Sequence, residues 1–224
     1  MGNIAPERQS GSQDPPSQVQ SQSQSMFRPL VAFDFDGTLT TKDSFIAFLW
    51  WRSGPAAYAA RMLALAPASA TYLLDRDRGR LKAAAVRRFL AGMTRAELEA
   101  AAQDFAEAHG RALLRPDALR AWRRWQAEGA RLVIVTASPE TIVSPIARGL
   151  GADLLLGTRL AFDDAGRVTG DFDGENCRGP EKVRRLQAVF GEDVHLEAAY
   201  GDTDGDREML ALAEEQGMKV FNGT

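Results

Sequence analysis

The sequence predicts an α/β protein in which a doubly wound, Rossmann-like parallel sheet carries an inserted helical cap domain. From residue 132 onward, apolar strand patterns alternate with helical patterns, and this alternation is typical of a parallel sheet with helices on both faces. A first strand precedes this region near residue 31, and no strand pattern is convincing between residues 43 and 115. We therefore assign residues 29–42 and 116–224 to the α/β core and residues 43–115 to the cap.

The elements of the core can be taken in chain order. The first strand, VAFDFDGTLT at residues 31–40, ends in a tight turn at Gly37. The run LVIV reads as a buried parallel strand, and Ser138 followed by Pro139 reads as a helix N-cap with a first-turn proline. Further on we expect a helix over 139–150, a strand over 154–157, a hairpin over 159–172 turning at 163–166, a helix opening at 179–180, a strand over 194–200, a helix over 206–215 and a strand over 219–221.

Helical patterns fill the cap. Thr94 and Glu97 form a capping box, and apolar residues then recur at helical spacing. Residues 44–51 and 53–74 are strongly apolar, although Pro67 and small residues disfavour a membrane-spanning helix. Two interpretations of these apolar segments stay open: they form a core of packed alanine and leucine, or they form a lipid-facing surface flanked by arginines. The arginines are Arg76, Arg78, Arg80, Arg87 and Arg88.

Composition narrows the classes of partner. The 224 residues are 45% hydrophobic, which allows a sizeable core, and 27 basic against 30 acidic residues give a net charge of −3. We therefore expect no nucleic-acid partner, and the balance of charges favours a small substrate or a local charged patch instead. A single cysteine, Cys177, excludes an internal disulfide framework and favours the cytoplasm. Residues 1–28, rich in Gln, Ser and Pro, are expected to be disordered, and whether residues 1–25 belong to the native protein is left open.

The pair Asp34 and Asp36 indicates a charged reaction centre. Residues i and i+2 of a strand share a face, so both carboxylates can point out of the carboxyl end of the first strand, where open α/β sheets bind ligands. Two carboxylates held this close need a cation or a shared proton.

Three further features should meet this pair at the same edge. Thr136 follows the second strand, where its hydroxyl either binds phosphate or only shapes a turn. Lys182 lies in the first turn of a helix, where it opposes the macrodipole unless an anion offsets it; the alternative is a solvated surface lysine. In the loop GDTDGD, Asp202 lies near the start and Asp206 four residues further on, a spacing suited to a metal, whereas Arg207 and Ala213 exclude an EF-hand.

Together, DFDGT, VTAS, the Glu-Lys pair and GDxxxD resemble the motifs of the haloacid dehalogenase superfamily. Their order and the helical cap resemble subclass IB, the group around phosphoserine phosphatase. The resemblance implies a phosphomonoester hydrolase in which Asp34 is the nucleophile that forms an aspartyl-phosphate and Asp36 the general acid and base. The presence of Asp36 argues against a dehalogenase and against a transport ATPase.

The same resemblance implies one Mg²⁺ ion. It would be held by Asp34, the backbone carbonyl of Asp36 and Asp202, with Asp206 supporting a metal water or Lys182. Thr136 and Lys182 would bind the remaining phosphoryl oxygens.

The sequence departs from phosphoserine phosphatases at two substrate positions, where it has Asp43 instead of glutamate and Gly205 instead of asparagine. Asp43 either contacts an ammonium group or caps the next helix. The run CRGPEK around Cys177 and the apolar cap resemble the phosphatidylglycerophosphatase C branch, whose enzymes act on a lipid from the cytoplasmic face of the membrane. Phosphoserine remains the alternative substrate, and a catalytically idle regulatory or membrane-binding module the alternative class. We expect His109 and His195 to be structural.

Overall fold

The computed structural model describes residues 1–2, 28–65 and 78–223. Nearly all of the N-terminal segment, for which we expect disorder, lies outside these residues. Residues 66–74 of the apolar cap segment also lie outside them.

A five-stranded parallel sheet forms the centre of the protein, as predicted. Its order is β3-β2-β1-β6-β7, and the two strands that flank β1 come much later in the chain. The strands are β1 (Leu30–Phe33), β2 (Arg131–Pro139), β3 (Leu154–Thr158), β6 (Leu196–Gly201) and β7 (Ala213–Met218). A separate antiparallel hairpin, predicted from its turn residues, joins β4 (Leu160–Phe162) to β5 (Val168–Phe172).

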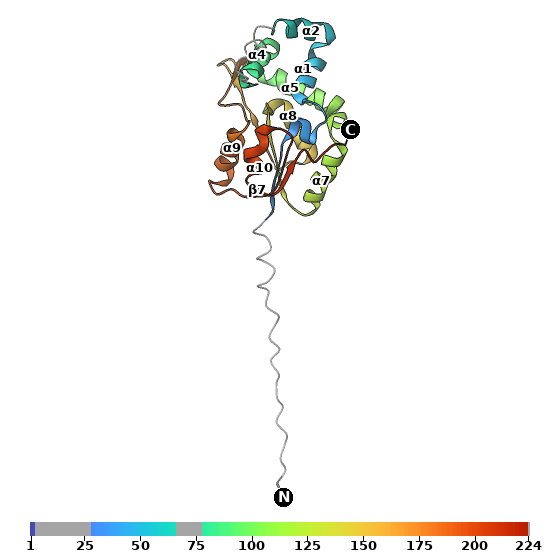
Figure 1. Cartoon of the computed structure of the whole chain (residues 1–224), viewed down its shortest axis with the longest axis vertical. Coiled ribbons are helices and arrows are strands. Elements are labelled where there is room, and N and C mark those ends of the chain that lie inside the picture. The colour runs from blue at the N-terminus through green and yellow to red at the C-terminus, as the bar shows by residue number, and fades with distance from the viewer. Residues whose placement is uncertain (3–27, 66–77, 224) are drawn as a thin grey trace.

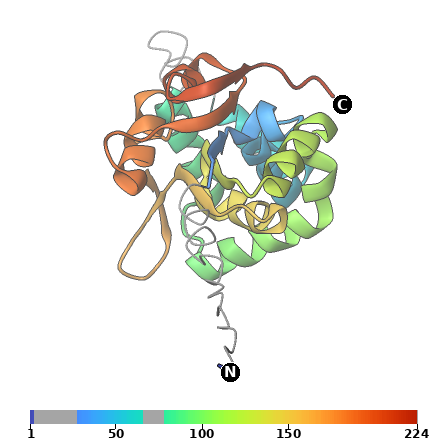
Figure 2. The ribbon, with the colours of Figure 1, turned by 90° about the horizontal axis from the view of Figure 1, so that it is seen from below.

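Helices cover both faces of the sheet because its buried strands are apolar on both sides. Val31 and Phe33 pack in the cluster that includes residues of α7 (Pro116–Ala127) and α8 (Glu140–Leu150), whereas Ala32 packs in the cluster that includes residues of α9 (Pro180–Phe190) and α10 (Arg207–Leu210). In Figures 1 and 2, α9 and α7 lie on opposite sides of the sheet.

The cap helices lie over the carboxyl ends of the strands (Figure 1). They are α1 (Ser44–Ser53), α2 (Pro55–Leu63), α4 (Arg78–Leu90), α5 (Arg95–Phe105) and the short α6 (Arg111–Leu113). The predicted capping box begins α5. The two connections to the cap run side by side, since Thr41 N donates to Leu113 O at 2.9 Å and Arg115 N to Leu39 O at 2.8 Å. Among the described residues, no helix has both the length and the hydropathy needed to cross a membrane.

The C-terminal elements differ from the prediction. The helix expected over 206–215 ends at Leu210, and the last strand is Ala213–Met218 rather than 219–221. The segment AEEQ favours a helix by propensity, but it pairs with β6 as an edge strand, and this tertiary pairing overrides the local preference. Lys219, with φ of 55°, follows the strand in a left-handed conformation.

Candidate active site

Asp34 lies at the carboxyl end of β1 and is fixed by contacts on both its backbone and its side chain. Its N–H donates to Tyr200 O of β6 at 2.8 Å. Its Oδ1 accepts from Lys182 Nζ at 2.6 Å and its Oδ2 from Thr38 Oγ1 at 3.2 Å. Burial raises the pKa of this carboxyl to about 7, and the charge of Lys182 opposes the increase. Asp34 is therefore an enclosed carboxyl whose ionisation depends on nearby cations.

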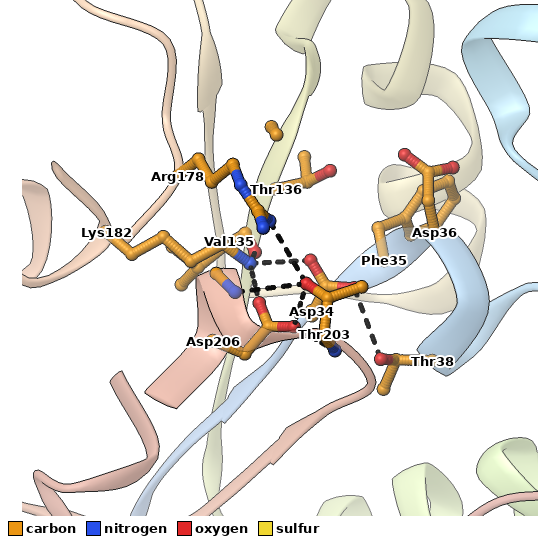
Figure 3. A network of polar contacts seen from close by, with 12 residues as sticks. Asp34, Phe35, Asp36, Thr38, Val135, Thr136, Arg178, Lys182, Thr203 and Asp206 are labelled. Atoms are coloured by element: carbon orange, nitrogen blue, oxygen red, sulfur yellow. Dashed lines mark hydrogen bonds and ion pairs between the residues drawn. The ribbon is translucent and has the colours of Figure 1, made fainter. Parts of the chain in front are cut away.

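Lys182 is buried in the first turn of α9 and uses all three of its N–H donors on the protein. Its Nζ donates to Asp34 Oδ1 at 2.6 Å, to Asp206 Oδ1 at 2.7 Å and to Val135 O at 2.6 Å (Figure 3). Burial alone would lower the pKa of this lysine, but the two carboxylates raise it above its ordinary value. These carboxylates offset the unfavourable position of Lys182 near the positive end of the helix dipole.

Asp206 organises the loop that follows β6. Its Oδ2 accepts from the N–H groups of Asp202 and Thr203, at 3.2 Å and 2.9 Å, and from Thr203 Oγ1 at 3.0 Å. Although burial favours the neutral form, Lys182 and the Thr203 donors lower the pKa of Asp206 below its usual value. In this arrangement Asp206 supports Lys182, which is one of the two roles considered from the sequence.

Asp202 has an oxygen that lacks a partner. Its Oδ1 is buried and meets no hydrogen-bond donor among the described residues. The side chain lies against Gly37, where a Cβ would come within 2.2 Å of Asp202 Oδ2 and where φ is +84°. Carboxylate oxygens of Asp34, Asp202 and Asp206 lie within 4.8 Å of one another. This all-oxygen set with an unpaired carboxylate oxygen fits a hard divalent cation such as Mg²⁺.

Asp36 points away from the group of Asp34, Lys182 and Asp206 (Figure 3). Its Oδ1 accepts from Ser44 N at 2.7 Å and its Oδ2 from Ser138 Oγ at 2.5 Å. The predicted N-cap role of Ser138 is wrong, because β2 continues through Pro139 and α8 begins only at Glu140. The Ser138 hydroxyl holds the second aspartate of the pair instead.

Thr136 and Asp43 line the same cavity as the acidic residues. Thr136 is buried, and its Oγ1 accepts from Ser138 N at 3.0 Å. Asp43 caps α1 by accepting from Ile46 N at 2.8 Å, as one of its two interpretations anticipated. The structure thus brings all seven candidate residues to one cavity, with Asp36 on a different side of it from Lys182.

The cavity has a volume of about 370 Å³, with a polar floor from the sheet edge and a mostly apolar roof from the cap. Two cations that line it were missed from the sequence, Lys82 and Arg178. Lys82 Nζ donates to Ala137 O at 2.7 Å, and burial lowers the pKa of this lysine. No sequence signal pointed to Lys82, because it lies in an arginine-rich stretch without a distinctive pattern. Arg178 could have been found, because it lies in the run CRGPEK that had already been singled out. The apolar roof residues are Phe45, Ile46, Leu49, Met62, Leu65, Leu81 and Ala85.

Cys177 and the two histidines take no part in the contacts around Asp34 and Lys182. Cys177 is buried, and burial raises the pKa of its thiol to about 11, so it behaves as a small core residue. His109 packs against Trp51 and Phe105, and His195 lies 3.1 Å from Glu214 on the surface.

Several known proteins are similar to this chain. Protein CicA of Caulobacter vibrioides is 62% identical over 194 residues, which cover 87% of each chain. A probable phosphatase of Mycobacterium tuberculosis is 40% identical over 85 residues, 37% of this chain and 29% of that protein. A Bordetella pertussis protein of unknown function has a TM-score of 0.68 at 26% identity, covering 82% of this chain and 86% of its own. A phosphoserine phosphatase carrying an analogue of a phospho-aspartyl intermediate has a TM-score of 0.52 at 22% identity, covering 83% of both chains.

The parallel sheet, with carboxylates gathered around a buried lysine at its edge, has the fold of phosphoserine phosphatases. The family model for haloacid dehalogenase-like hydrolases matches residues 31–211. The chain belongs to the haloacid dehalogenase-like hydrolases.

Proposed function

We propose that this hydrolase is a Mg²⁺-dependent phosphatase that works through an aspartyl-phosphate on Asp34 and acts on a phosphomonoester with an apolar organic group. The observation that carries the proposal is the placement of Asp34, which faces the cavity while Lys182 and Asp206 hold it in position. The neighbour with a phospho-aspartyl analogue supports the intermediate by analogy of fold alone.

In the proposed reaction, a carboxylate oxygen of Asp34 forms a bond to phosphorus as the bond from phosphorus to the leaving oxygen breaks. Asp36 donates a proton to the leaving alkoxide and then accepts one from the water that hydrolyses the acyl phosphate. Thr136 binds a phosphoryl oxygen, and Lys182 orients Asp34 and balances its charge.

Asp34, Asp202 and the backbone carbonyl of Asp36 would hold the Mg²⁺, with Asp206 beside them. When bound, the ion supplies positive charge that lets a phosphate dianion approach the acidic cluster.

Phosphate release from p-nitrophenyl phosphate tests this part of the proposal. Activity should require Mg²⁺, and Asp34→Asn should abolish it while the variant keeps its unfolding temperature. Trapping of a beryllofluoride mimic in wild type but not in Asp34→Asn would support the covalent step. Activity that survives Asp34→Asn contradicts the proposal, and absence of turnover by wild type on every phosphomonoester favours a catalytically idle module instead.

The apolar roof supports a lipid phosphate, such as phosphatidylglycerophosphate, as the substrate. The outer surface of the cap also exposes apolar side chains on α1 and α2, including Trp50 at 53% and Leu63 at 78%. Arg52 and Arg61 lie on the same two helices and favour an anionic surface. We propose peripheral contact of this cap surface with the inner face of a membrane.

The substrate test compares phosphate release from a vesicle-borne lipid phosphomonoester with release from phosphoserine, alongside sedimentation with vesicles that contain or lack anionic lipid. Trp50→Ser should reduce sedimentation and lipid turnover but leave p-nitrophenyl phosphate turnover unchanged. Preference for phosphoserine, which the phosphoserine phosphatase-like fold favours, without vesicle binding would contradict the lipid proposal.

A further inference from the structure

Within the described residues, the cations that line the active-site cavity are Lys82, Arg178 and Lys182. They differ in how many of their N–H groups do not already donate to the protein. Lys182 has none, because its three N–H groups already donate to Asp34, Asp206 and Val135. A phosphoryl dianion entering beside the aspartates would therefore gain no direct hydrogen bond from Lys182 unless one of these contacts broke. Another donor is needed at the floor of the cavity.

We propose that Arg178 is a further catalytic residue, whose guanidinium contacts the oxygens of the phosphoryl group during transfer. The proposal rests on the phosphatase function proposed above. An arginine stays charged at any relevant pH and presents paired donors that match phosphate oxygens, so it suits the charge that spreads over these oxygens in the transition state.

Arg178 is half-buried in the loop before α9, and its side chain points toward Thr203 and Asp34 (Figure 3). Its Nη1 donates to Thr203 Oγ1 at 3.1 Å. Its Nε and Nη2 have no protein acceptor in residues 28–65 and 78–223, and no carboxylate there lies within ion-pair distance of it. The guanidinium therefore retains donors for a ligand at a cavity that it lines.

Thr203 fixes the guanidinium relative to the nucleophile. Its Oγ1 accepts from Arg178 and donates to Asp206 Oδ2 at 3.0 Å. Asp206 in turn binds Lys182, which binds Asp34. A continuous chain of hydrogen bonds thus connects Arg178 to Asp34, which is the preorganisation that charge stabilisation in a transition state requires.

Gly205 leaves the room that the guanidinium occupies. A Cβ at this position would lie 1.9 Å from Arg178 Nη1 and 2.5 Å from its Cζ, so any larger residue must displace the arginine. The position that carries asparagine in phosphoserine phosphatases is Gly205 here, and the guanidinium of Arg178 fills the space that a side chain at this position would take. A substitution at Gly205 can therefore displace Arg178 without replacing it.

The test combines Arg178→Ala, Gly205→Ala and the double variant, assayed with p-nitrophenyl phosphate at saturating Mg²⁺ and with inorganic phosphate as a competitive inhibitor. Arg178→Ala should lower kcat/KM by about 10²-fold, as loss of a transition-state donor does, and should weaken inhibition by inorganic phosphate. Gly205→Ala should cause a similar loss alone but little further loss in the double variant, because alanine at 178 vacates the space. Arg207→Gln is the matched control, since this exposed arginine pairs with Asp204 on the same loop.

The outcomes separate this inference from the proposed function. Wild type without phosphatase activity, or an active Asp34→Asn, would overturn the function and the inference with it. Active wild type with kcat/KM and phosphate inhibition unchanged in Arg178→Ala would overturn the inference alone. The inference would also be overturned if the two single losses in kcat/KM added in the double variant, or if Arg207→Gln lost as much kcat/KM as Arg178→Ala. Thermal unfolding of each variant shows whether a loss of activity comes from misfolding. If Arg178→Ala is misfolded, unchanged kinetics of a folded Gly205→Ala would overturn the inference.

Discussion

Replacing Lys182 by methionine should destabilise the protein strongly. The side chain is 2% exposed, and methionine retains an unbranched apolar chain while removing the charge. Asp34 and Asp206 would then be left buried without the cation that both contact. Breaking a buried ion pair in this way costs about 3–5 kcal/mol. Because each kcal/mol shifts Tm by about 2–4 °C in a chain of this size, we expect Tm to fall by roughly 6–20 °C.

A second substitution tests the electrostatic cause. In the wild-type background, Asp206→Asn removes a partner of Lys182 and should destabilise the fold. In the Lys182→Met background, the same change removes one of two unpaired buried carboxylates and should recover part of the loss. The sign of the Asp206→Asn effect should therefore reverse between the two backgrounds.

Urea unfolding in EDTA, followed by circular dichroism, measures all four proteins without a contribution from bound metal. The reasoning would be refuted if Lys182→Met matched wild type in its unfolding midpoint. It would equally be refuted if Asp206→Asn shifted the midpoint in the same direction by the same amount in both backgrounds, because the loss would then not come from unpaired charge.

Three further substitutions or reagents test other features. Gly37→Ala should weaken Mg²⁺ binding in a calorimetric titration, because φ is +84° and the new Cβ would meet the Asp202 carboxylate at 2.2 Å; unchanged affinity would contradict the assignment of Asp202. Native Cys177 should resist a thiol reagent at pH 8, because a pKa of about 11 leaves roughly one thiolate per thousand, and should react on unfolding; rapid native labelling would contradict its burial. Tyr200→Phe should cost about 1–3 kcal/mol by thermal unfolding, because Trp125 Nε1 loses its 3.0 Å acceptor; an unchanged Tm would show that Trp125 finds another partner.

The sheet and its order of elements could be predicted because each interior strand is a short apolar run bounded by turn residues. The first two strands and the hairpin were found in this way. The edge strand β7 was misplaced, because AEEQGM carries no apolar run and becomes a strand only through pairing with β6. Edge strands depend on a neighbour that local sequence does not reveal.

The residues of the candidate site could be predicted where they occupy positions that are unfavourable for local stability. Paired aspartates at a strand end and a lysine against a helix dipole both conflict with local stability, and the structure brings Asp34 and Lys182 within 2.6 Å. Arg178 was not identified, because an arginine in a polar loop conflicts with nothing nearby in sequence. Its relevance arises from the space above Gly205, which only the folded chain defines.

The central position of β1 has a consequence for how the protein is made on the ribosome. The strand synthesised first lies between β2 and β6, and its pairing with β6 matches Val31 with Ala198. A nascent chain can therefore form cap helices while β1 still lacks both neighbours, and the sheet closes only through contacts of large sequence separation, which form slowly. Asp34 obtains its backbone partner Tyr200 and its side-chain partner Lys182 only late in this process. The surroundings of Asp34 are therefore complete only when synthesis of the chain is nearly finished, and a growing chain carries β1 and Asp34 without these partners.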